Sequence, residues 1–231
     1  MRKGKRIENL YKKFDKNQVY SLSKTVELLK EFSAVKFDES VDISINLNVN
    51  PRRAEQNIRS TVVLPNGTGK TKKILVIAKA DKLKEAEEAG ADYFGAEDMV
   101  EKVAGGWLDF DVLISTPDMM KDLGKLGKVL GPRGLMPNPK AGTVTFDIKK
   151  AVQEVKLGKI EFRVDEYGIM HLCVGKVSFE NDKLIANIKV LIDTIVKLKP
   201  STVKGALIKS VTVSSTMGPG IKLDLIELLN K

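Results

Sequence analysis

The side chains best suited to chemistry lie between Leu126 and Thr143, where glycine, proline and basic residues alternate. The prolines fix φ and remove amide donors, and the glycines permit conformations closed to other residues, so the segment is a shaped loop. No Asp or Glu occurs between Lys125 and Phe146. A shaped backbone that presents only positive charge suits a polyanion, although a basic turn between two elements remains an alternative. The basic residues of this loop are Lys125, Lys128, Arg133 and Lys140.

A second segment, Gly67 to Thr71, resembles the end of a nucleotide-binding P-loop. That motif needs a glycine five positions before Gly69, and position 64 is Leu, so the motif is incomplete. We interpret residues 65–70 as a flexible junction instead. An enzyme that handles a nucleotide or a phosphate remains the opposing hypothesis.

Cys173 and His171 are the only cysteine and the only histidine, which excludes an intrachain disulfide framework and a Cys/His zinc cluster. Their spacing places both on one face of a strand but activates neither as nucleophile or base. Asp109, Asp111 and Asp118 could hold magnesium, but helix capping by Asp118 explains one of them more simply. We therefore predict that the protein is not an enzyme and has no catalytic residue, cofactor or metal.

The charge of the chain also favours nucleic acid as the partner. Lys and Arg outnumber Asp and Glu by 39 to 30, which gives a formal net charge of +9. Many soluble proteins share such an excess, so the charge alone does not decide. No run of about 18 apolar residues exists, and no apolar core follows the basic amino terminus. We predict a cytoplasmic protein that is neither exported nor embedded in a membrane.

Alternating apolar and polar residues predict strands near both ends of the chain. The expected strands are 41–49, 58–64, 160–164, 170–174 and 209–215, with the third and fourth forming a hairpin. A helix capped by Ser21 or Ser23 and a long amphipathic helix from Asn181 to Leu198, stopped by Pro200, accompany them. Helices together with antiparallel-style strands indicate an α+β fold.

In the middle of the chain, short apolar runs alternate with helical patterns. The expected strands are 74–78, 93–94, 112–115 and 143–146. The expected helices are one that Asp81 would cap and that runs through Ala89, two at 96–104 and 118–130, and one after Asp147, which would cap it. Repeated strand and helix units with apolar strands predict a parallel sheet covered by helices, as in a Rossmann-like α/β domain.

We therefore predict a discontinuous two-domain protein that combines the α/β and α+β classes. An α+β domain would consist of residues 1–66 plus 159–231, and a three-layer α/β domain of residues 67–158 would be inserted into it. The inserted segment has 15 Lys plus Arg and 14 Asp plus Glu, against 24 and 16 in the remainder. Affinity for phosphates should therefore reside mainly in the terminal domain, apart from the basic loop.

The loop at Leu126–Thr143 is similar to the signature loop of the large-subunit ribosomal protein L-one family, and three further segments resemble the RNA face of that family. These segments are Ala34–Ser40, His171–Phe179 and Ser214–Gly220. The resemblance extends over nearly the whole chain. One departure is Ser40, where the family commonly has Thr, so that the hydroxyl is kept but a methyl contact is lost.

The resembling segments contain side chains suited to RNA. Lys36 and Lys176 can meet phosphates, and Phe37 can lie against a sugar or a base. Short hydroxyls, and glycines that allow close approach, suit the minor groove of RNA with its ribose hydroxyls. The predicted RNA-binding residues are Lys36, Phe37, Ser40, His171, Gly175, Lys176, Ser178, Ser210, Thr216, Met217 and Gly218, with Lys128, Arg133 and Lys140 as a second RNA contact.

The resemblance places Thr216, Met217 and Gly218 at the centre of the contact, together with residues that match Glu27, Phe37 and Ser210. Glu27 would buffer or accept a hydrogen bond rather than meet a phosphate, because two anions repel. Without the resemblance each residue has an ordinary interpretation, since a lone Phe or Met more often packs in a core.

The resemblance implies a structural function in the ribosome. The chain would bind ribosomal RNA of the large subunit and form the mobile stalk near the tRNA exit site. Other implied partners are the exit-site tRNA and the protein's own messenger RNA, whose translation it would repress. We expect a monomer when the protein is free. The junctions at 65–70 and 157–159 would let the two domains open or close about the RNA.

Overall fold

The computed structural model describes residues 5–229, with side chains at all of these positions except 54, 80, 81 and 229. The chain divides into two compact units. The terminal unit comprises the residues up to Gly69 and from Phe162 onwards, and the central unit comprises Lys70–Glu161. Both units combine helices and sheets, so the predicted mixed class is confirmed.

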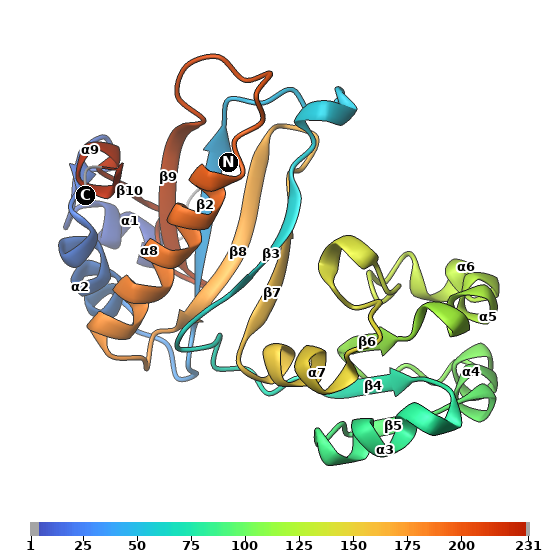
Figure 1. Cartoon of the computed structure of the whole chain (residues 1–231). Coiled ribbons are helices and arrows are strands. Elements are labelled where there is room, and N and C mark those ends of the chain that lie inside the picture. Colours follow the sequence, from blue (N-terminus) through green and yellow to red (C-terminus); the bar gives the residue numbers. More distant parts are fainter. Residues whose placement is uncertain (1–4, 230–231) are drawn as a thin grey trace. The chain divides into compact units, whose positions relative to one another are not determined.

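The terminal unit is built on a five-stranded sheet with the order β1-β10-β9-β2-β8 (Figure 1). Only the pair β1 and β10 is parallel. Two helices, α2 and α8, pack against each other and against strands of this sheet. The bounds are β1 Val19–Tyr20, α2 Leu22–Phe32, β2 Ser40–Leu47, β8 Ile169–Lys176, α8 Asn181–Lys197, β9 Ile208–Ser215 and β10 Ile221–Leu223.

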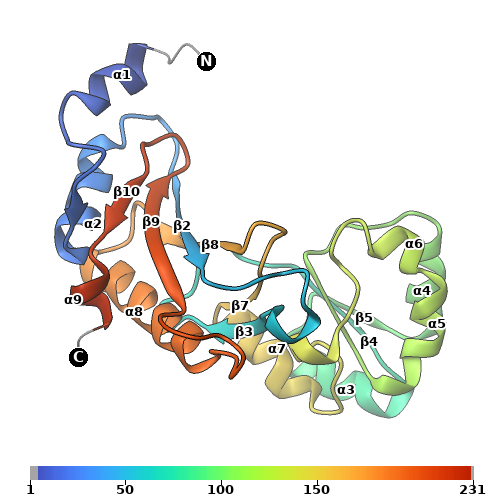
Figure 2. The ribbon, with the colours of Figure 1, turned by 90° about the horizontal axis from the view of Figure 1, so that it is seen from above.

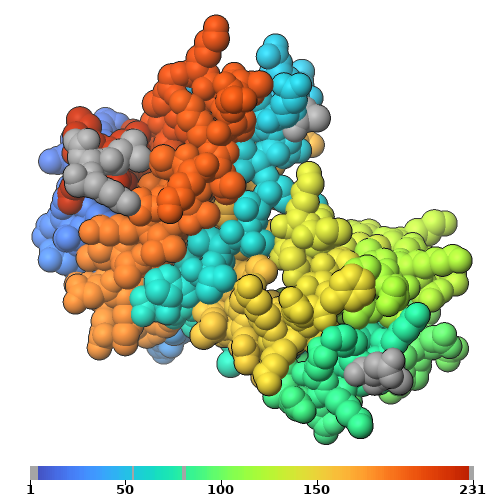
Figure 3. Space-filling model, viewed as in Figure 1, coloured from blue at the N-terminus to red at the C-terminus, as the bar shows by residue number. Residues whose placement is uncertain are grey.

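Alternation along β2 explains why this sheet has one apolar and one polar face. Val41, Ile43 and Ile45 are fully buried, whereas the intervening Asp42 and Ser44 are partly exposed. Because side chains alternate between the faces of a strand, one face packs on the helices and the other stays polar. Figure 3 shows α8, in orange, forming part of the surface of the terminal unit on the helix side.

The helix α2 begins where the sequence predicted. Ser21 is its N-cap, and its side chain accepts a hydrogen bond of 3.3 Å from the backbone amide of Lys24. This bond satisfies one of the amides that the first helical turn leaves without a partner. Ser23, the other candidate, lies inside the helix.

The predicted hairpin at 160–174 is wrong in its pairing. The two strands are connected by a turn in which the Asp165 amide donates to the carbonyl of Ile169 at 2.9 Å. However, β7 (Lys159–Arg163) pairs with β3 (Arg59–Val63) in a separate two-stranded sheet, and β8 pairs with β2. Alternation shows that a segment is a strand, but it does not identify the partner, and here distant segments supply both partners.

Short elements at the ends of the terminal unit were not predicted. The helix α1 (Lys5–Tyr11) precedes the sheet, and α9 (Leu225–Leu229) follows it. A single 3₁₀ turn, η1 (Ala54–Gln56), lies between β2 and β3. These elements span at most two turns, which is too short for a periodic pattern to show.

The central unit has a three-stranded parallel sheet with the order β5-β4-β6 (Figure 1), and Figure 2 shows β4 and β5 of this sheet from above. Every residue of β4 is buried, because helices cover both faces. One apolar cluster joins the sheet to α4, α5 and α6, and the other joins it to α3 and α7. The bounds are β4 Ile74–Ile77, α3 Ala80–Glu88, β5 Tyr93–Gly95, α4 Glu97–Ala104, β6 Val112–Ser115, α5 Met120–Lys125, α6 Gly127–Leu130 and α7 Ile148–Lys156.

Three local predictions for the central unit are corrected. The expected strand at 143–146 is reduced to a single parallel bridge between Ser115 and Val144. The expected helix at 118–130 is divided into a 3₁₀ turn (Pro117–Met119), α5 and α6, since glycine weakens helices near the break at Leu126. The predicted caps are also corrected: Asp147 occupies the N-cap position of α7 but its side chain makes no capping bond, and the N-cap of α3 is Lys79 rather than Asp81.

The junction at 65–69 is held by hydrogen bonds rather than being free. Asn187 of α8 is fully buried, and its amide group donates to the carbonyl oxygens of Gly67 at 2.9 Å and Val174 at 2.8 Å. Its side-chain oxygen accepts from the Asn66 amide at 3.1 Å. At Gly69, φ is +71° and an added Cβ would lie 2.8 Å from Cγ of Lys176. The terminal unit therefore fixes the chain up to its boundary at Gly69.

Within residues 5–229, no helix is long and apolar enough to cross a membrane.

Candidate nucleic-acid interface

Three of the segments singled out in the sequence meet at one end of the five-stranded sheet. Because β2 is antiparallel to β8 and β9, its first residues lie beside their last ones. Ser40 is paired with Lys176, and Val41 with Ser215. We call the residues gathered here the end surface: Lys36, Phe37, Ser40, Lys176, Ser178, Thr216, Met217 and Gly218.

Thr216 fastens the turn after β9 to the beginning of β2. Its amide donates to the carbonyl of Ser40 at 3.1 Å, and its hydroxyl accepts from the amide of Ser40 at 3.1 Å. The same hydroxyl lies 3.3 Å from the Ser40 carbonyl. Thr216 is therefore positioned by the backbone of Ser40, and the Ser40 hydroxyl is not needed for this link.

A buried carboxylate that the sequence analysis missed supports the same turn. Glu39 has no exposed surface, and its side chain accepts hydrogen bonds from the Met217 amide at 3.2 Å and from the Ser33 hydroxyl at 3.4 Å. A buried carboxylate requires such partners, so Glu39 holds Met217 in place. The only signal in the sequence was an acidic residue directly before an alternating strand.

Two large apolar side chains project from this end surface. Phe37 is 54% exposed and Met217 is 47% exposed, although both lie among polar and charged residues. The ordinary interpretation of a core Phe and a packed Met therefore does not apply here. Both side chains are therefore accessible to a binding partner.

Some polar and charged groups of the end surface already form hydrogen bonds within the protein, and others do not. The Lys176 ammonium donates to the Asp38 carbonyl at 3.1 Å, and the Ser178 hydroxyl donates to the Asp38 carboxylate at 2.8 Å. Lys36 is exposed and has no ion pair in the described part of the chain. The guanidinium of Arg6, from α1, donates to the carbonyl of Met217. A basic run at the amino terminus was the signal for this contribution.

The two glycines of the predicted site are required for packing. An added Cβ at Gly218 would lie 2.3 Å from Oγ of Ser215, and one at Gly175 would lie 2.8 Å from Cδ2 of Leu184. Both distances are shorter than a Cβ contact allows. Gly218 lies in the turn of the end surface, whereas Gly175 is buried.

His171 and Ser210 lie on the polar face of the sheet. His171 is joined to Ser44 by a hydrogen bond of 3.0 Å through Nδ1, and its Nε2 is 3.7 Å from the carboxylate of Asp165. The amide of Ile169, followed by that of Tyr167, lowers the pKa of Asp165 by hydrogen bonding to the carboxylate. Ser210 precedes Thr216 by six residues, or roughly 20 Å along an extended strand, so it belongs to a different part of this face.

Glu27 is exposed on α2, where its carboxylate forms an ion pair of 3.1 Å with Lys24. The hydrogen bonds that order the end surface come from Glu39 and Asp38 instead.

The central unit carries its own basic loop. Lys128, Arg133 and Lys140 are exposed, and Lys128 lies on α6 rather than in the loop. Asn138 shapes the loop: its side chain accepts from the Lys140 amide at 2.8 Å, and its own amide donates to the Thr143 hydroxyl at 2.8 Å. Left-handed backbone at Gly134 and Gly142 explains two of the glycines in this segment.

The residues considered for catalysis or metal binding have other partners. No group of three or more metal-ligating side chains occurs among the described residues. The Asp109 carboxylate pairs with the Lys73 ammonium at 2.8 Å, which raises the pKa of Lys73. Asp118 is not a helix cap, because Thr116 holds that position. Cys173 lies 3.5 Å from the carbonyl of Gly175.

Comparisons with known proteins identify the family of the chain. The model of the ribosomal protein L1p/L10e family matches residues 29–219, which include the end surface and the basic loop. The large ribosomal subunit protein uL1 of Protochlamydia amoebophila is 56% identical over 226 residues, covering 98% of this chain and 96% of that protein. The chain therefore belongs to the ribosomal protein L1p/L10e family.

Proposed function

We propose that the chain binds structured ribosomal RNA through the end surface and forms the mobile stalk near the tRNA exit site. As a member of its family, it is a structural, non-enzymatic constituent of the large ribosomal subunit. The observation that carries the proposal is the exposure of Phe37 and Met217 on a turn that Glu39 and Thr216 hold in place.

This surface suits folded RNA better than a regular duplex. The apolar groups can pack on unstacked bases or riboses, and the nearby hydroxyls and amides can meet ribose hydroxyls. Lys36 and the guanidinium of Arg6 supply positive charge beside them. Since the hydrogen bonds already fix the turn, little conformational entropy would be lost on binding.

The proposal includes two domains with different tasks: residues 1–66 plus 159–231 would bind the main RNA site, and an inserted Rossmann-like domain of residues 67–158 would add a second contact. Net charge supports this division, because the terminal unit carries 23 Lys plus Arg against 15 Asp plus Glu, and the central unit 16 against 15. Lys128, Arg133 and Lys140 would make the second contact. The chain passes between the two domains near Gly69 and again near Gly158, and these two connections would act as the hinge.

Translational repression would follow from the same recognition. A messenger RNA whose fold presents the same shape as the ribosomal site would compete for the end surface. The proposed contacts are to ribose, phosphate and stacked bases, which many sequences can present. The protein would act as a monomer in this competition.

The exit-site tRNA requires a different surface, and the terminal unit has a suitable one. Arg52 and Arg53 are exposed at the other end of β2, and neither forms an ion pair with any described residue. Tyr167, 84% exposed, lies in the adjoining turn, which is fixed by a bond of 2.9 Å from the Leu47 amide to the Gly168 carbonyl. Arginines beside an exposed aromatic ring suit a second RNA.

Replacing Met217 by Asp tests the main site. We expect Met217→Asp to weaken binding of a large-subunit ribosomal RNA fragment at least about tenfold in a gel-shift assay, because it removes an apolar contact and repels phosphates. Val196→Asp is the matched control: Val196 is 41% exposed on α8, and the change adds the same charge. Equal affinities of the two variants would contradict the proposed site.

A further inference from the structure

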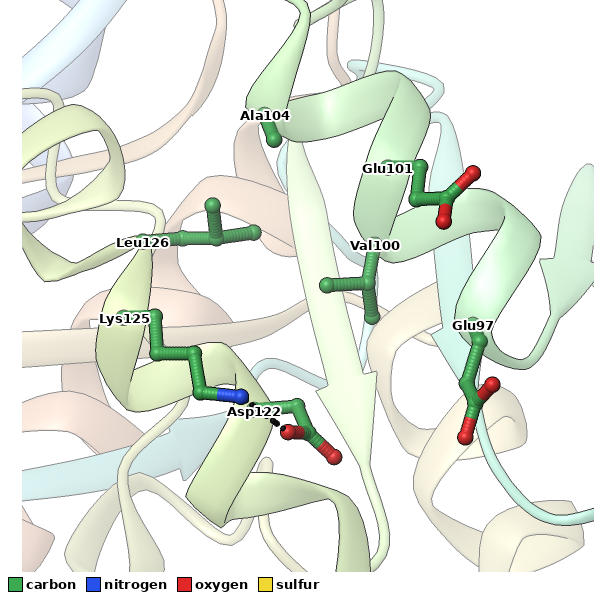
Figure 4. Close-up of a pocket in the computed structure, with 7 residues that line it drawn as sticks. All are labelled: Glu97, Val100, Glu101, Ala104, Asp122, Lys125 and Leu126. Carbon is green, nitrogen blue, oxygen red and sulfur yellow. Dashed lines mark hydrogen bonds and ion pairs between the residues drawn. The ribbon is translucent and has the colours of Figure 1, made fainter.

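An open groove lies between α4 and α5 of the central unit, and Lys125 and Leu126, where the basic loop begins, form part of its lining. Its volume is about 450 Å³, within the range of about 300–1,000 Å³ typical of ligand sites. Figure 4 shows Val100 and Ala104 of α4 facing Leu126, which follows α5, across the groove. Leu126 is buried and Val100 is half-buried, so the groove has an apolar floor.

The rim of this groove is acidic. Asp122 and Lys125 pair within α5 at 2.8 Å, which lowers the pKa of Asp122 and raises that of Lys125, and the charge of Glu97 adds to the rise in the pKa of Lys125. Glu97 and Glu101 of α4 remain. Both are exposed, and neither forms a salt bridge with another residue that the structure describes. The rim thus has three carboxylates, those of Glu97, Glu101 and Asp122, and one ammonium group, that of Lys125.

Helix stability does not account for both carboxylates. Glu97 lies in the first turn of α4, where a negative charge interacts favourably with the helix dipole. Glu101 lies one turn later, and like charges at this spacing destabilise a helix. The pair therefore places two negative charges beside the apolar floor of the groove.

We propose that this groove binds a basic, partly apolar peptide segment of another protein. An apolar side chain of the segment would rest on Val100 and Leu126, and an adjacent arginine or lysine would lie between the carboxylates of Glu97 and Glu101. Arginine fits best, because its planar group can meet carboxylates with two donors. RNA is excluded from the rim by repulsion between phosphates and carboxylates.

The test is a titration of the full chain with each of three short synthetic peptides. Nuclear magnetic resonance follows the backbone amide signals of the isotope-labelled protein. The first peptide alternates arginine and leucine, the second replaces arginine by glutamate, and the third replaces leucine by serine. We expect saturable shifts at residues 97–104 and 120–126 with the first peptide only. Equal shifts with the first two peptides, or shifts that never saturate, would overturn the proposal.

Two double variants show whether the peptide binds at the groove itself or at any acidic surface of the central unit. Combining Glu97→Gln with Glu101→Gln should weaken the first peptide about tenfold. The matched control combines Glu87→Gln with Glu88→Gln, which removes the same charge from α3, in the other apolar cluster of the central unit. Unchanged amide spectra elsewhere show that each variant is folded.

Other occupants would appear as distinct outcomes. If the double variant and its control bind the peptide equally, the contact is nonspecific and the proposal is wrong. It is also wrong if ribosomal RNA shifts the groove amides while the peptide does not, or if the same amides shift with protein concentration alone. This last result would identify a second copy of the chain as the occupant.

Discussion

At the scale of single residues, much of the RNA-binding proposal depends on which polar groups are already occupied. Lys176 and Ser178 donate to the Asp38 segment, and Thr216 is bonded to Ser40. The sequence analysis identified Lys176, Ser178, Ser40 and Thr216, but it could not show that these residues form hydrogen bonds with neighbouring segments of the same surface. It could not indicate Glu39 either, because a carboxylate before a strand is usually solvated, and only the folded chain buries it.

Asp165 gives a prediction at this scale. Backbone amides of Ile169 and Tyr167 stabilise its carboxylate, so its pKa is lower in the folded protein than in the unfolded one. Its contribution to stability is therefore present above the unfolded pKa and is lost as the pH falls through the folded pKa.

We expect Asp165→Asn to destabilise the protein at neutral pH, and the difference from the native chain to shrink towards about pH 3. Urea unfolding followed across this range measures the effect. Glu166→Gln is the control, because it removes the same charge from the next position of the turn. A difference that stays constant with pH would show that the lost hydrogen bonds, and not the ionisation, matter.

At the scale of elements, the sequence predicted the long and periodic segments well. The strand β2 and the helices α2 and α8 are confirmed, since each repeats its apolar residues over several turns or alternations. The failures occur where a segment is short or where distant partners decide. Gly124 and Gly127 divide a predicted helix, and β7 pairs with β3 rather than with its neighbour.

The clamp from α8 to the 65–69 junction gives a prediction at this scale. Asn187→Ala removes the donors to two carbonyl oxygens and an acceptor for the Asn66 amide. Leaving buried polar groups without partners costs about 1–3 kcal/mol each, so we expect the free energy of unfolding to fall by roughly 2–4 kcal/mol.

Lys189→Ala, an exposed position on the same helix, is the control for the loss of a side chain from α8. Chemical denaturation compares the two variants. If Asn187→Ala unfolds at the same denaturant concentration as the control, water replaces the amide and the clamp contributes little to stability.

At the scale of the whole molecule, the two units differ clearly in net charge: the basic excess of the chain lies almost entirely in the terminal unit. The mixed fold class could be predicted from the sequence, because apolar periodicity is a local property of the chain, whereas the RNA-binding proposal came from the resemblance of whole segments to a known family. The acidic groove between α4 and α5 could not, since it depends on how two helices lie together.

The charge division predicts how salt affects RNA binding. Lys36→Gln should reduce the slope of log affinity against log salt concentration by about one, because it removes one phosphate contact. Changing Lys128, Arg133 and Lys140 together to Gln should leave the affinity for a short RNA fragment within about threefold. A larger loss for the triple variant than for Lys36→Gln would move the main site to the central unit.

The position of β9 in the sheet determines when the protein becomes competent during its synthesis. β9 lies between β2 and β10, so the sheet lacks a central strand until residues 208–215 have been made. The central unit, by contrast, is complete once Glu161 has emerged. At translation rates of about 5–20 residues per second, the nascent chain has a complete central unit and an incomplete terminal unit for several seconds. The proposed RNA site at Met217 therefore cannot form before β9 has been made.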